Sequence, residues 1–570
     1  MDLQINNIGD YRHLLDAILA ELERDRAVDR IWSGDYTVWG SEPAEISNRL
    51  GWLNSPQEMS SRIDGLRQLA FDLHKENYTH ALLLGMGGSS LAPEVLRKTF
   101  GSRDGYLDLA VLDSTDPGAV LYHADRLDPA KTLFIVATKS GTTTETISFL
   151  KYFYNWISDR LPAEVAGDHF IAITDPGSSL AELADQYSFR ASYLNDPDIG
   201  GRYSALSYFG LLPAVLMGVD VKSLLNHSFD MIKSCRKTSL SVEDGNPGVI
   251  LGAVMGTLAE AGRDKLTIIA SPRIASFGNW VEQLIAESTG KRGKGILPVV
   301  EDLPGGPSVY GDDRAFVYLK MMEDNSRDNA VDALENAGHP VIRLYIDGLN
   351  DIGGQFFLWE MATVVACRLL KVNPFDQPDV EASKILTGKM LGDYAKDGVL
   401  SHEVPVLTSG EIAVYGDVKA DNPEEALAEF LSQAGPGDYV AIQAYLQPTD
   451  EADRALGELK TRIRDRYGRA TTVGYGPRYL HSTGQLHKGD AGRGLFVQLT
   501  AEDARDAPIP DEIGSGDSSV TFSVLKRAQA MGDRKALLNA GRQAIRFHLG
   551  RDTTGGLRFL MKALQPSDRQ

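Results

Sequence analysis

Four loops of the sequence combine glycines, hydroxyl groups and charged side chains that could do chemistry. The first, at 85–90, reads Gly-Met-Gly-Gly-Ser-Ser and lies between an apolar run and a helix expected to start near Leu91. Glycines let a backbone approach a ligand closely, and a helix N-terminus offers N–H groups to an anion. A dinucleotide loop would need a third glycine where Ser90 stands, and the acidic Asp113 comes late for that motif. Anion binding and a plain strand-to-helix turn both stay open here.

The second loop, at 137–146, reads Ala-Thr-Lys-Ser-Gly-Thr-Thr-Thr-Glu-Thr and holds one lysine among several hydroxyl groups. Thr142 and Glu145 have the spacing of a capping box, which predicts a helix start at this point. Neutral donors and one cation at a helix N-terminus suit a phosphate monoester, whereas the order of a nucleotide P-loop is absent. The alternative interpretation is a surface helix with a long Ser/Thr-rich cap.

The third and fourth loops supply a guanidinium group and a carboxylate. Arg202 follows two glycines, so it could stabilise an oxyanion without losing its own proton. Glu287 lies near the C-terminal end of a helix expected over 276–290, where a negative charge is unfavourable and proton uptake is favoured, as a general base requires. Taken singly, Arg202 could be a surface ion pair and Glu287 a solvated residue of a helix cap.

Alternating strands and helices must position these loops. Short apolar runs separated by helix-length segments predict parallel sheets covered on both faces. The expected strands of a first unit are 81–84, 109–112, 133–137 and 170–174, and a helix at 203–217 closes it. After Asn246-Pro247 the pattern restarts, with strands expected at 266–270, 296–300, 315–319 and 341–346 and helices at 249–260, 276–290 and 354–370. The predicted fold is α/β, with two doubly wound parallel-sheet domains.

The two ends of the chain differ from this pattern. Helical spacing at 11–26 and 61–75 predicts a helical N-terminal segment without a clear strand. The C-terminal region predicts an α/β extension, with strands at 439–446, 471–475 and 495–499 and helices at 451–467, 522–531 and 535–549. The expected division is 1–75 (helical), 76–245 and 246–395 (the two sheet domains), and 396–570 (the extension).

Composition excludes several classes of protein. The 570 residues are 43% hydrophobic and 24% charged, which is typical of a folded globular chain. A net charge of −20, from 58 basic and 78 acidic residues, argues against nucleic acid or an anionic membrane as partner. Two cysteines exclude a disulfide framework and a cysteine-rich metal site. Because no signal peptide or membrane-length apolar run is found, we expect a cytoplasmic protein.

These four loops, together with Asn-Pro-Phe-Asp-Gln-Pro-Asp-Val-Glu-Ala-Ser-Lys at 373–384, resemble the glucose-6-phosphate isomerase family. The order matches over roughly residues 78–390, and Gly-Gly-Arg-Tyr-Ser at 200–204 is a specific signature. The C-terminal part, with His-Ser-Thr-Gly-Gln-Leu-His-Lys at 481–488, is similar to the isomerase portion of bacterial transaldolase–glucose-6-phosphate isomerase fusions. The resemblance implies sugar-isomerase (SIS) domains, a sugar-phosphate substrate, no cofactor or metal, and a homodimer.

The resemblance also implies roles for individual residues. Glu287 matches the base, Arg202 the arginine that stabilises the enediolate, Lys384 a catalytic lysine and Gln377 a substrate-contacting glutamine. The residues that match the family's sugar-phosphate loops are Gly88, Ser89, Thr138, Lys139, Ser140 and Thr143.

One position departs from the family pattern. The histidine that assists ring opening is replaced by Phe356, which cannot transfer a proton. Either Lys384 opens the ring alone or a histidine from elsewhere takes over, the candidates being His481 and His487, with His481 assigned to the catalytic set. A structural role for either histidine is the competing interpretation.

The predicted activity is interconversion of glucose 6-phosphate and fructose 6-phosphate through an enediol(ate), a step of glycolysis and gluconeogenesis. One alternative is a phosphosugar sensor without catalysis, which would need the phosphate loop but not Glu287, Arg202 and Lys384 together. Another is isomerisation of a different phosphosugar, such as mannose 6-phosphate. A dehydrogenase that uses NAD is disfavoured by Ser90.

Overall fold

The computed structural model describes residues 3–301, 303–400 and 403–564, and the chain divides into two units. Unit 1 comprises Met1–Asp113, Leu127–Pro304 and Arg314–Gln377, whereas unit 2 comprises Ser114–Arg126, Gly305–Asp313 and Pro378–Gln570. The strands of both expected sheet domains fall within unit 1, whereas 114–126, 305–313 and 378–395 belong to unit 2. Each unit is described below by itself.

The first sheet of unit 1 is parallel throughout and has the strand order β3-β2-β4-β5-β6. Its strands are β2 (His80–Gly85), β3 (Asp108–Leu112), β4 (Thr132–Ala137), β5 (Phe170–Thr174) and β6 (Ala191–Leu194). All residues of β4 and β5 are buried, as expected for strands covered on both faces. Because β3 and β4 lie on opposite sides of β2, the strand order reverses beside β2, and the carboxyl ends of β2 and β4 are where a ligand is expected.

The helices of this sheet are α4 (Ile63–Lys75), α5 (Gly88–Phe100), α7 (Thr144–Ser158), α8 (Ser179–Gln186) and α9 (Tyr208–Leu216). Two sequence expectations are wrong here. Helix α5 begins at Gly88 and not near Leu91, because Gly87 adopts a positive φ of +57° and acts as the N-cap. The expected capping box also does not form, since Thr143 is the N-cap of α7 and the Thr142 hydroxyl lies 2.9 Å from that of Ser140.

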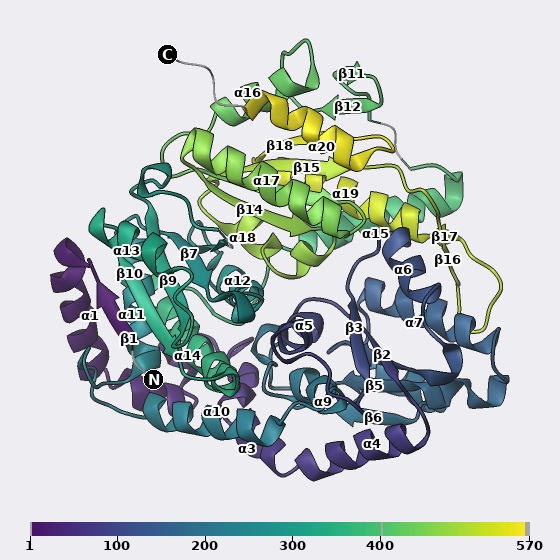
Figure 1. Cartoon of the computed structure of the whole chain (residues 1–570), viewed down its shortest axis with the longest axis horizontal. Coiled ribbons are helices and arrows are strands. Elements are labelled where there is room, and N and C mark those ends of the chain that lie inside the picture. The colour runs from purple at the N-terminus through teal and green to yellow at the C-terminus, as the bar shows by residue number, and fades with distance from the viewer. Residues whose placement is uncertain (1–2, 302, 401–402, 565–570) are drawn as a thin grey trace. The chain divides into compact units, whose positions relative to one another are not determined.

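The second sheet has the order β1-β10-β9-β7-β8. Its parallel strands are β7 (Lys265–Ala270), β8 (Leu297–Glu301), β9 (Arg314–Met321) and β10 (Val341–Ile346). The fifth strand, β1 (Leu3–Asn6), pairs antiparallel with β10, so the expectation of an N-terminal segment without a strand is wrong. In Figure 1, β1 and helix α1 (Arg12–Arg24) lie beside β10 and helix α11 (Pro247–Glu260).

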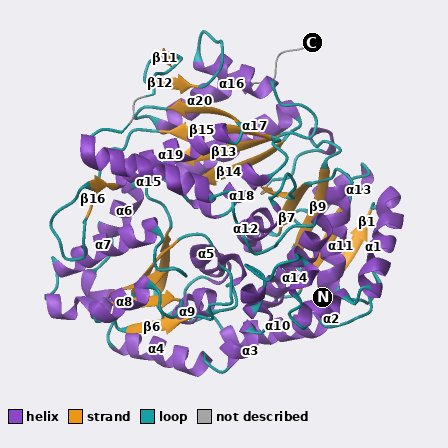
Figure 2. Cartoon of the chain, turned by 180° about the vertical axis from the view of Figure 1, so that it is seen from behind, coloured by secondary structure: helices purple, strands orange, loops and turns teal. Residues whose placement is uncertain are grey.

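Helix packing around the second sheet is close. The remaining helices of unit 1 are α2 (Ala27–Trp32), α3 (Ser55–Ser60), α10 (Val221–Cys235), α12 (Phe277–Thr289), α13 (Asp328–Asn336) and α14 (Ile352–Leu370). Helices α11 and α14 are packed so tightly that a Cβ atom on Gly252 would lie 2.3 Å from the Ala362 carbonyl oxygen. Helices α5 and α12 lie side by side in both views (Figures 1 and 2), which brings the two sheets' loops together.

A short 3-10 turn, η7 (Gly201–Tyr203), precedes α9 and carries the arginine singled out in the sequence. The expected helix at 203–217 therefore starts later than predicted, at Tyr208.

Unit 2 is built on a six-stranded sheet with the order β11-β12-β18-β15-β13-β14. The strands are β11 (Leu407–Ser409), β12 (Ile412–Tyr415), β13 (Tyr439–Tyr445), β14 (Ala470–Tyr475), β15 (Gly494–Thr500) and β18 (Gln543–His548), and a small ribbon pairs β16 (Pro508–Ile509) with β17 (Val520–Thr521). Strands β14, β13, β15 and β18 are mutually parallel, while β12 and β11 are antiparallel additions.

The helices of unit 2 are α6 (Pro117–Ala124), α15 (Glu381–Asp397), α16 (Pro423–Ser432), α17 (Asp450–Tyr467), α18 (Gly484–Gly489), α19 (Phe522–Asn539) and α20 (Thr553–Met561). The expected pair of helices at 522–531 and 535–549 is wrong. Helix α19 runs unbroken to Asn539, and Gly541 at φ +73° then turns the chain into strand β18. None of the helices that the structure describes combines the length and apolarity needed to cross a bilayer.

Candidate active site

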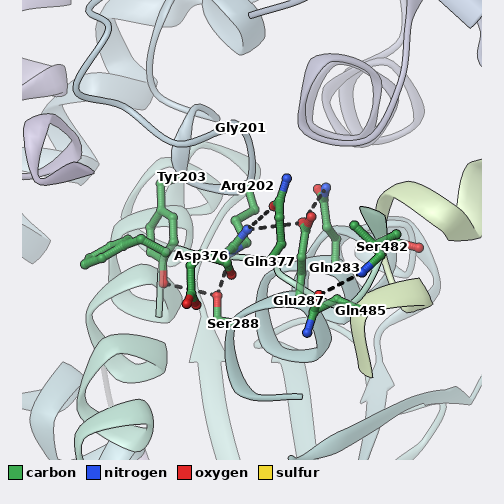
Figure 3. A network of polar contacts seen from close by, with 12 residues as sticks. Gly201, Arg202, Tyr203, Gln283, Glu287, Ser288, Asp376, Gln377, Ser482 and Gln485 are labelled. Atoms are coloured by element: carbon green, nitrogen blue, oxygen red, sulfur yellow. Dashed lines mark hydrogen bonds and ion pairs between the residues drawn. The ribbon is translucent and has the colours of Figure 1, made fainter. Parts of the chain in front are cut away.

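Arg202 is the centre of a buried network of polar contacts in unit 1 (Figure 3). Its Nε donates to Ser288 Oγ at 2.9 Å, and its Nη1 donates to Gln377 Oε1 at 2.8 Å. Its Nη2 donates to two backbone carbonyls, those of Pro374 at 2.7 Å and Asp376 at 3.1 Å. The planar guanidinium is therefore fixed from three directions, which an ammonium group could not reproduce.

Glu287 lies directly beside this guanidinium. Its Oε2 is 3.6 Å from Arg202 Nη1, and the two side chains are only 9% and 3% exposed. Gln283, one turn earlier on α12, donates from Nε2 to the same oxygen at 3.2 Å, which the spacing of four residues along a helix allows. Opposite charges removed from water interact more strongly than at a surface, so the pair is electrostatically coupled.

A second buried cation, Lys291, holds the segment that Arg202 contacts. Its Nζ donates to the Asn373 and Asp376 carbonyls and, at 2.7 Å, to the Asp376 carboxylate. Burial, reinforced by the nearby charge of Arg202, lowers the pKa of Lys291 to about 8, although Asp376 acts in the opposite direction. Arg202 and Lys291 thus both donate to the Asp376 carbonyl, and together they fix the chain that presents Gln377.

The glycine-rich loop after β2 touches the loop that carries Arg202. A Cβ atom on Gly88 would lie only 1.9 Å from the carbonyl oxygen of Gly201. Gly88 is also the first residue of α5, so the N-terminus of this helix and η7 approach each other backbone to backbone. Only glycine permits this approach, and Ser89 follows at once in the helix.

The hydroxyl-rich loop joins β4 to α7. The Thr138 and Thr143 hydroxyls lie 2.9 Å apart, and Ser140 and Thr142 are exposed. Gly141 adopts φ +74°, and a Cβ atom there would lie 2.5 Å from the backbone nitrogen of Leu180. The N-cap residue of α7 makes no side-chain cap bond among the described residues, so the helix start is left to a ligand or solvent.

Lys139 differs from the free phosphate-binding cation that the sequence suggested. Its Nζ donates to the carboxylate of Asp175 and, at 2.8 Å, to the Pro197 carbonyl. Burial raises the pKa of Asp175, and Lys139 opposes that effect. Lys139 therefore ties the hydroxyl-rich loop to the stretch that leads into η7, and its charge is partly balanced.

Arg202, Glu287 and Gln377 are brought together, although they are far apart in sequence. Lys384 and His481 belong to unit 2. Lys384 lies in the first turn of α15, where it donates to Glu381 at 2.7 Å, and His481 ends a short 3-10 turn, η11 (Arg478–His481).

The alternative histidine, His487, is in the core of unit 2. Its ring lies 5.0 Å from that of Phe496 and 6.0 Å from that of Tyr479. Burial lowers the pKa of His487 to about 3, so the ring stays neutral at neutral pH. Phe356 is equally buried in unit 1, with its ring 4.7 Å from that of Trp280 in an edge-on contact.

Ser288, Lys291 and Gln283 have no role predicted from the sequence, although all three lie within four residues of Glu287. The spacing of Gln283 and Glu287 is a signal that could have been used, because residues four apart share a helix face. For Lys291 no local signal exists, since its partners lie in 373–376.

Comparison with known proteins places this geometry in context. Residues 71–314 match the family model described as Phosphoglucose isomerase. The chain is 27% identical over 409 residues to a glucose-6-phosphate isomerase of Geobacter sp. (strain M21), covering 60% of this chain and 74% of the relative. A glucose-6-phosphate isomerase of Rubrobacter xylanophilus is 26% identical over 434 residues, covering 67% of this chain and 97% of the relative.

Solved structures show the same fold. A hypothetical protein from Thermus thermophilus superposes with a TM-score of 0.57 at 24% identity, over 68% of this chain and all of that one. A glucose-6-phosphate isomerase from Chlamydia trachomatis gives a TM-score of 0.56 at 16% identity, over 67% of this chain and 86% of that one. These neighbours confirm the predicted α/β fold with parallel sheets of the sugar-isomerase type.

Proposed function

We propose that the chain is a member of the phosphoglucose isomerase family, whose model matches residues 71–314, and that it interconverts glucose 6-phosphate and fructose 6-phosphate. The single observation that carries this proposal is the buried pair of Glu287 and Arg202, 3.6 Å apart, with Gln377 on the same guanidinium. A binding protein for phosphosugars would need the hydroxyl-rich loop but not this carboxylate.

In the proposed mechanism Glu287 moves one proton. Its carboxylate takes the proton from carbon 2 of the open-chain aldose, and the electrons of that bond form the carbon 1–carbon 2 double bond of an enediolate. Arg202 faces the oxygen on carbon 1, which gains negative charge. The hydroxyl proton on oxygen 2 then moves to oxygen 1, and Glu287 returns its own proton to carbon 1, so that carbon 2 becomes the carbonyl carbon of the ketose. The reaction is redox-neutral overall, and its two charged steps use a base and a fixed cation.

The phosphate end of the substrate is assigned to the two loops at the carboxyl ends of β2 and β4. Ser140 and Thr143 supply hydroxyl donors at the start of α7, with Thr138 and Lys139 behind them, while Gly88 and Ser89 offer the N-terminus of α5. Binding energy gained there orients the reacting carbons and therefore lowers the barrier as well as the Michaelis constant.

Ring opening requires a group that can transfer a proton. Phe356 has no proton to give, so Lys384 and His481 are the proposed groups for the ring oxygen. His487 is the weaker candidate, because its buried ring stays neutral at the pH of the reaction.

Three further points belong to the same proposal. The chain acts as a homodimer, which sedimentation analysis would test. It acts in the cytoplasm, which localisation of a tagged chain would test. The four segments 1–75, 76–245, 246–395 and 396–570 are its domains, which limited proteolysis would test.

A coupled assay with purified protein tests the activity. We expect turnover of fructose 6-phosphate and glucose 6-phosphate, with slower turnover of mannose 6-phosphate. Lys384→Ala and His481→Ala should slow the reaction of the ring-closed sugar, whereas Lys396→Ala, a change later on α15, should not. Binding of glucose 6-phosphate without any turnover would overturn the proposal in favour of a sensor.

A further inference from the structure

Unit 2 carries another candidate site, independent of the proposed activity, at the carboxyl ends of its parallel strands. In this sheet β13 is flanked by β14 on one side and β15 on the other. The chain passes from β13 through α17 to β14 and then returns across β13 to β15. Ligands of open α/β sheets bind outside the carboxyl ends of the strands at such a reversal of strand order.

The face of this sheet that α19 covers is unusually polar near those ends. Residues two apart on a strand point to the same face, and the register aligns them across β13, β15 and β18. The two aligned rows are Gln443, Gln498 and Arg546, and then Tyr445, Thr500 and His548. Every one of these three strands therefore ends with two polar side chains where a buried parallel sheet normally places apolar ones.

Several of these polar atoms are buried without a hydrogen-bond partner among the described residues. They are both amide atoms of Gln443, the Oε1 of Gln498 and the Nε of Arg546. Leaving such groups unsatisfied costs about 1–3 kcal/mol each. Of these residues Arg546 lines the neighbouring cavity, so its Nε is the atom that a ligand or ordered water in the cavity could satisfy.

A cavity of about 170 Å³ opens at this place. Tyr445, Thr500, His548 and Arg546 line it from the strands, and Lys526 and Arg527 line it from α19. A water molecule occupies about 30 Å³ of liquid, so the space holds a small molecule of a few heavy atoms and not a nucleotide.

The basic residues around the cavity differ in how much of their hydrogen-bonding capacity is already used. Lys526 is saturated, because it donates to Asp116 at 2.7 Å and also to Asp503. Arg527 is exposed on α19. Burial lowers the pKa of His548, and the cations Arg546, Arg527 and Lys526 act in the same direction, whereas Glu502 opposes them.

Glu403 occupies the arginine end of the cavity. Its carboxylate lies 2.9 Å from Arg534 and 2.8 Å from Arg546, and both arginines are about nine-tenths buried. Glu403 itself is 37% exposed and lies four residues before the start of β11. A carboxylate bridging two buried arginines makes the contacts that an oxyanion from solution would make.

We propose that this cavity binds a small phosphorylated metabolite, whose phosphate group takes the contact with Arg546 that Glu403 now makes. Arg527 and the Thr500 hydroxyl complete the phosphate shell, and the carbon part lies toward Tyr445. The site differs in position and composition from the hydroxyl-rich loop of unit 1.

Calorimetric titration of the full chain with inorganic phosphate and with glycerol 3-phosphate tests the proposal. Glu403→Gln removes the competing carboxylate and should tighten binding of both probes several-fold, whereas Arg546→Gln should weaken it at least about tenfold. Glu458→Gln, an exposed change on α17, is the matched control and should alter neither. A stronger response to glycerol 3-phosphate than to phosphate identifies an ester as the ligand.

Two further readouts separate this site from the one in unit 1. The bound phosphate should raise the pKa of His548, seen by NMR of labelled histidines, and the Michaelis constant for fructose 6-phosphate should be unchanged in Glu403→Gln. Unaltered or weaker phosphate binding in Glu403→Gln overturns the proposal, and this result is informative even if Arg546→Gln does not fold. Binding that persists unchanged in folded Arg546→Gln overturns it as well.

Discussion

Gly88→Ala tests whether the close approach of two backbones sets the position of Arg202. The added Cβ atom would lie 1.9 Å from the Gly201 carbonyl oxygen, whereas real Cβ contacts do not fall below 3.0 Å. The two segments must therefore separate by about 1.1 Å. This separation is costly because the Cβ atom is fixed directly to one backbone and the oxygen that it meets belongs to the other backbone. Misplacement of a reacting group by 1 Å can cost about 10²-fold in rate.

We expect the Gly88→Ala enzyme to lose about 10²-fold in kcat for fructose 6-phosphate in the coupled assay, with a melting temperature lowered by a few degrees. Gly201→Ala is the matched control, because no heavy atom of the described residues lies within 4 Å of its added Cβ atom. That variant should melt like the wild type. A Gly88→Ala enzyme with wild-type turnover and stability would refute the reasoning, as would equal destabilisation by Gly201→Ala.

Three further predictions concern charge. Arg202→Lys keeps the positive charge but loses the planar guanidinium group that donates to Ser288 and Gln377, so kcat should fall about 10²-fold. A change in the Michaelis constant alone would contradict this prediction. Lys291 loses its proton as the pH rises through about 8, so kcat should decline there. Lys291→Arg should move that decline to higher pH. The same decline of kcat at alkaline pH in both enzymes would contradict this prediction. His487 is neutral in the fold and takes up a proton on unfolding between pH 6.5 and about 3, so the free energy of unfolding should fall by about 2 kcal/mol from pH 6.5 to 5. In denaturant melts, His487→Phe should make the free energy of unfolding depend less on pH, whereas the exposed His13→Gln should not. An unchanged pH dependence in His487→Phe would show that this ring does not titrate as described.

The mostly buried strands of unit 1 were predictable because they are continuous apolar runs. Strand β6, Ala191–Leu194, was not among the predicted strands, and its residues are partly or fully exposed. β5 and β10 have the predicted bounds, Phe170–Thr174 and Val341–Ile346. Strand β1 was not predictable, since Leu3–Asn6 is a short edge strand whose partner, β10, comes more than three hundred residues later. The local sequence therefore does not indicate this long-range pairing.

The end of unit 2 was misread for a different reason. In β18 the polar Arg546 and His548 alternate with the buried Ile545 and Phe547, and this alternation indicates a strand. The two polar side chains face α19 and the cavity, where a buried sheet would normally have apolar residues, and the apolar spacing of this segment therefore predicts a helix instead of a strand. Gly541, just after Asn539, was the signal that a helix ends there.

The candidate site was only partly accessible from sequence. Residue chemistry alone singled out Arg202 and Glu287 as a possible oxyanion partner and base, but their pairing across 85 positions came from family resemblance. Contacts such as that of Lys291 with Asp376 depend on how the end of α12 meets the loop after α14, which tertiary packing decides.

Exchange of the carbon-bound proton with solvent is the most direct measurement of the central claim, that Glu287 beside Arg202 moves a proton within a six-carbon phosphate ester. Fructose 6-phosphate incubated in heavy water with the wild type should gain deuterium at carbon 1, followed by NMR. Glu287→Gln should still bind the sugar phosphate but incorporate none, while Glu260→Gln, an exposed change on α11, should behave as the wild type. Deuterium incorporation at the wild-type rate in Glu287→Gln would contradict the account.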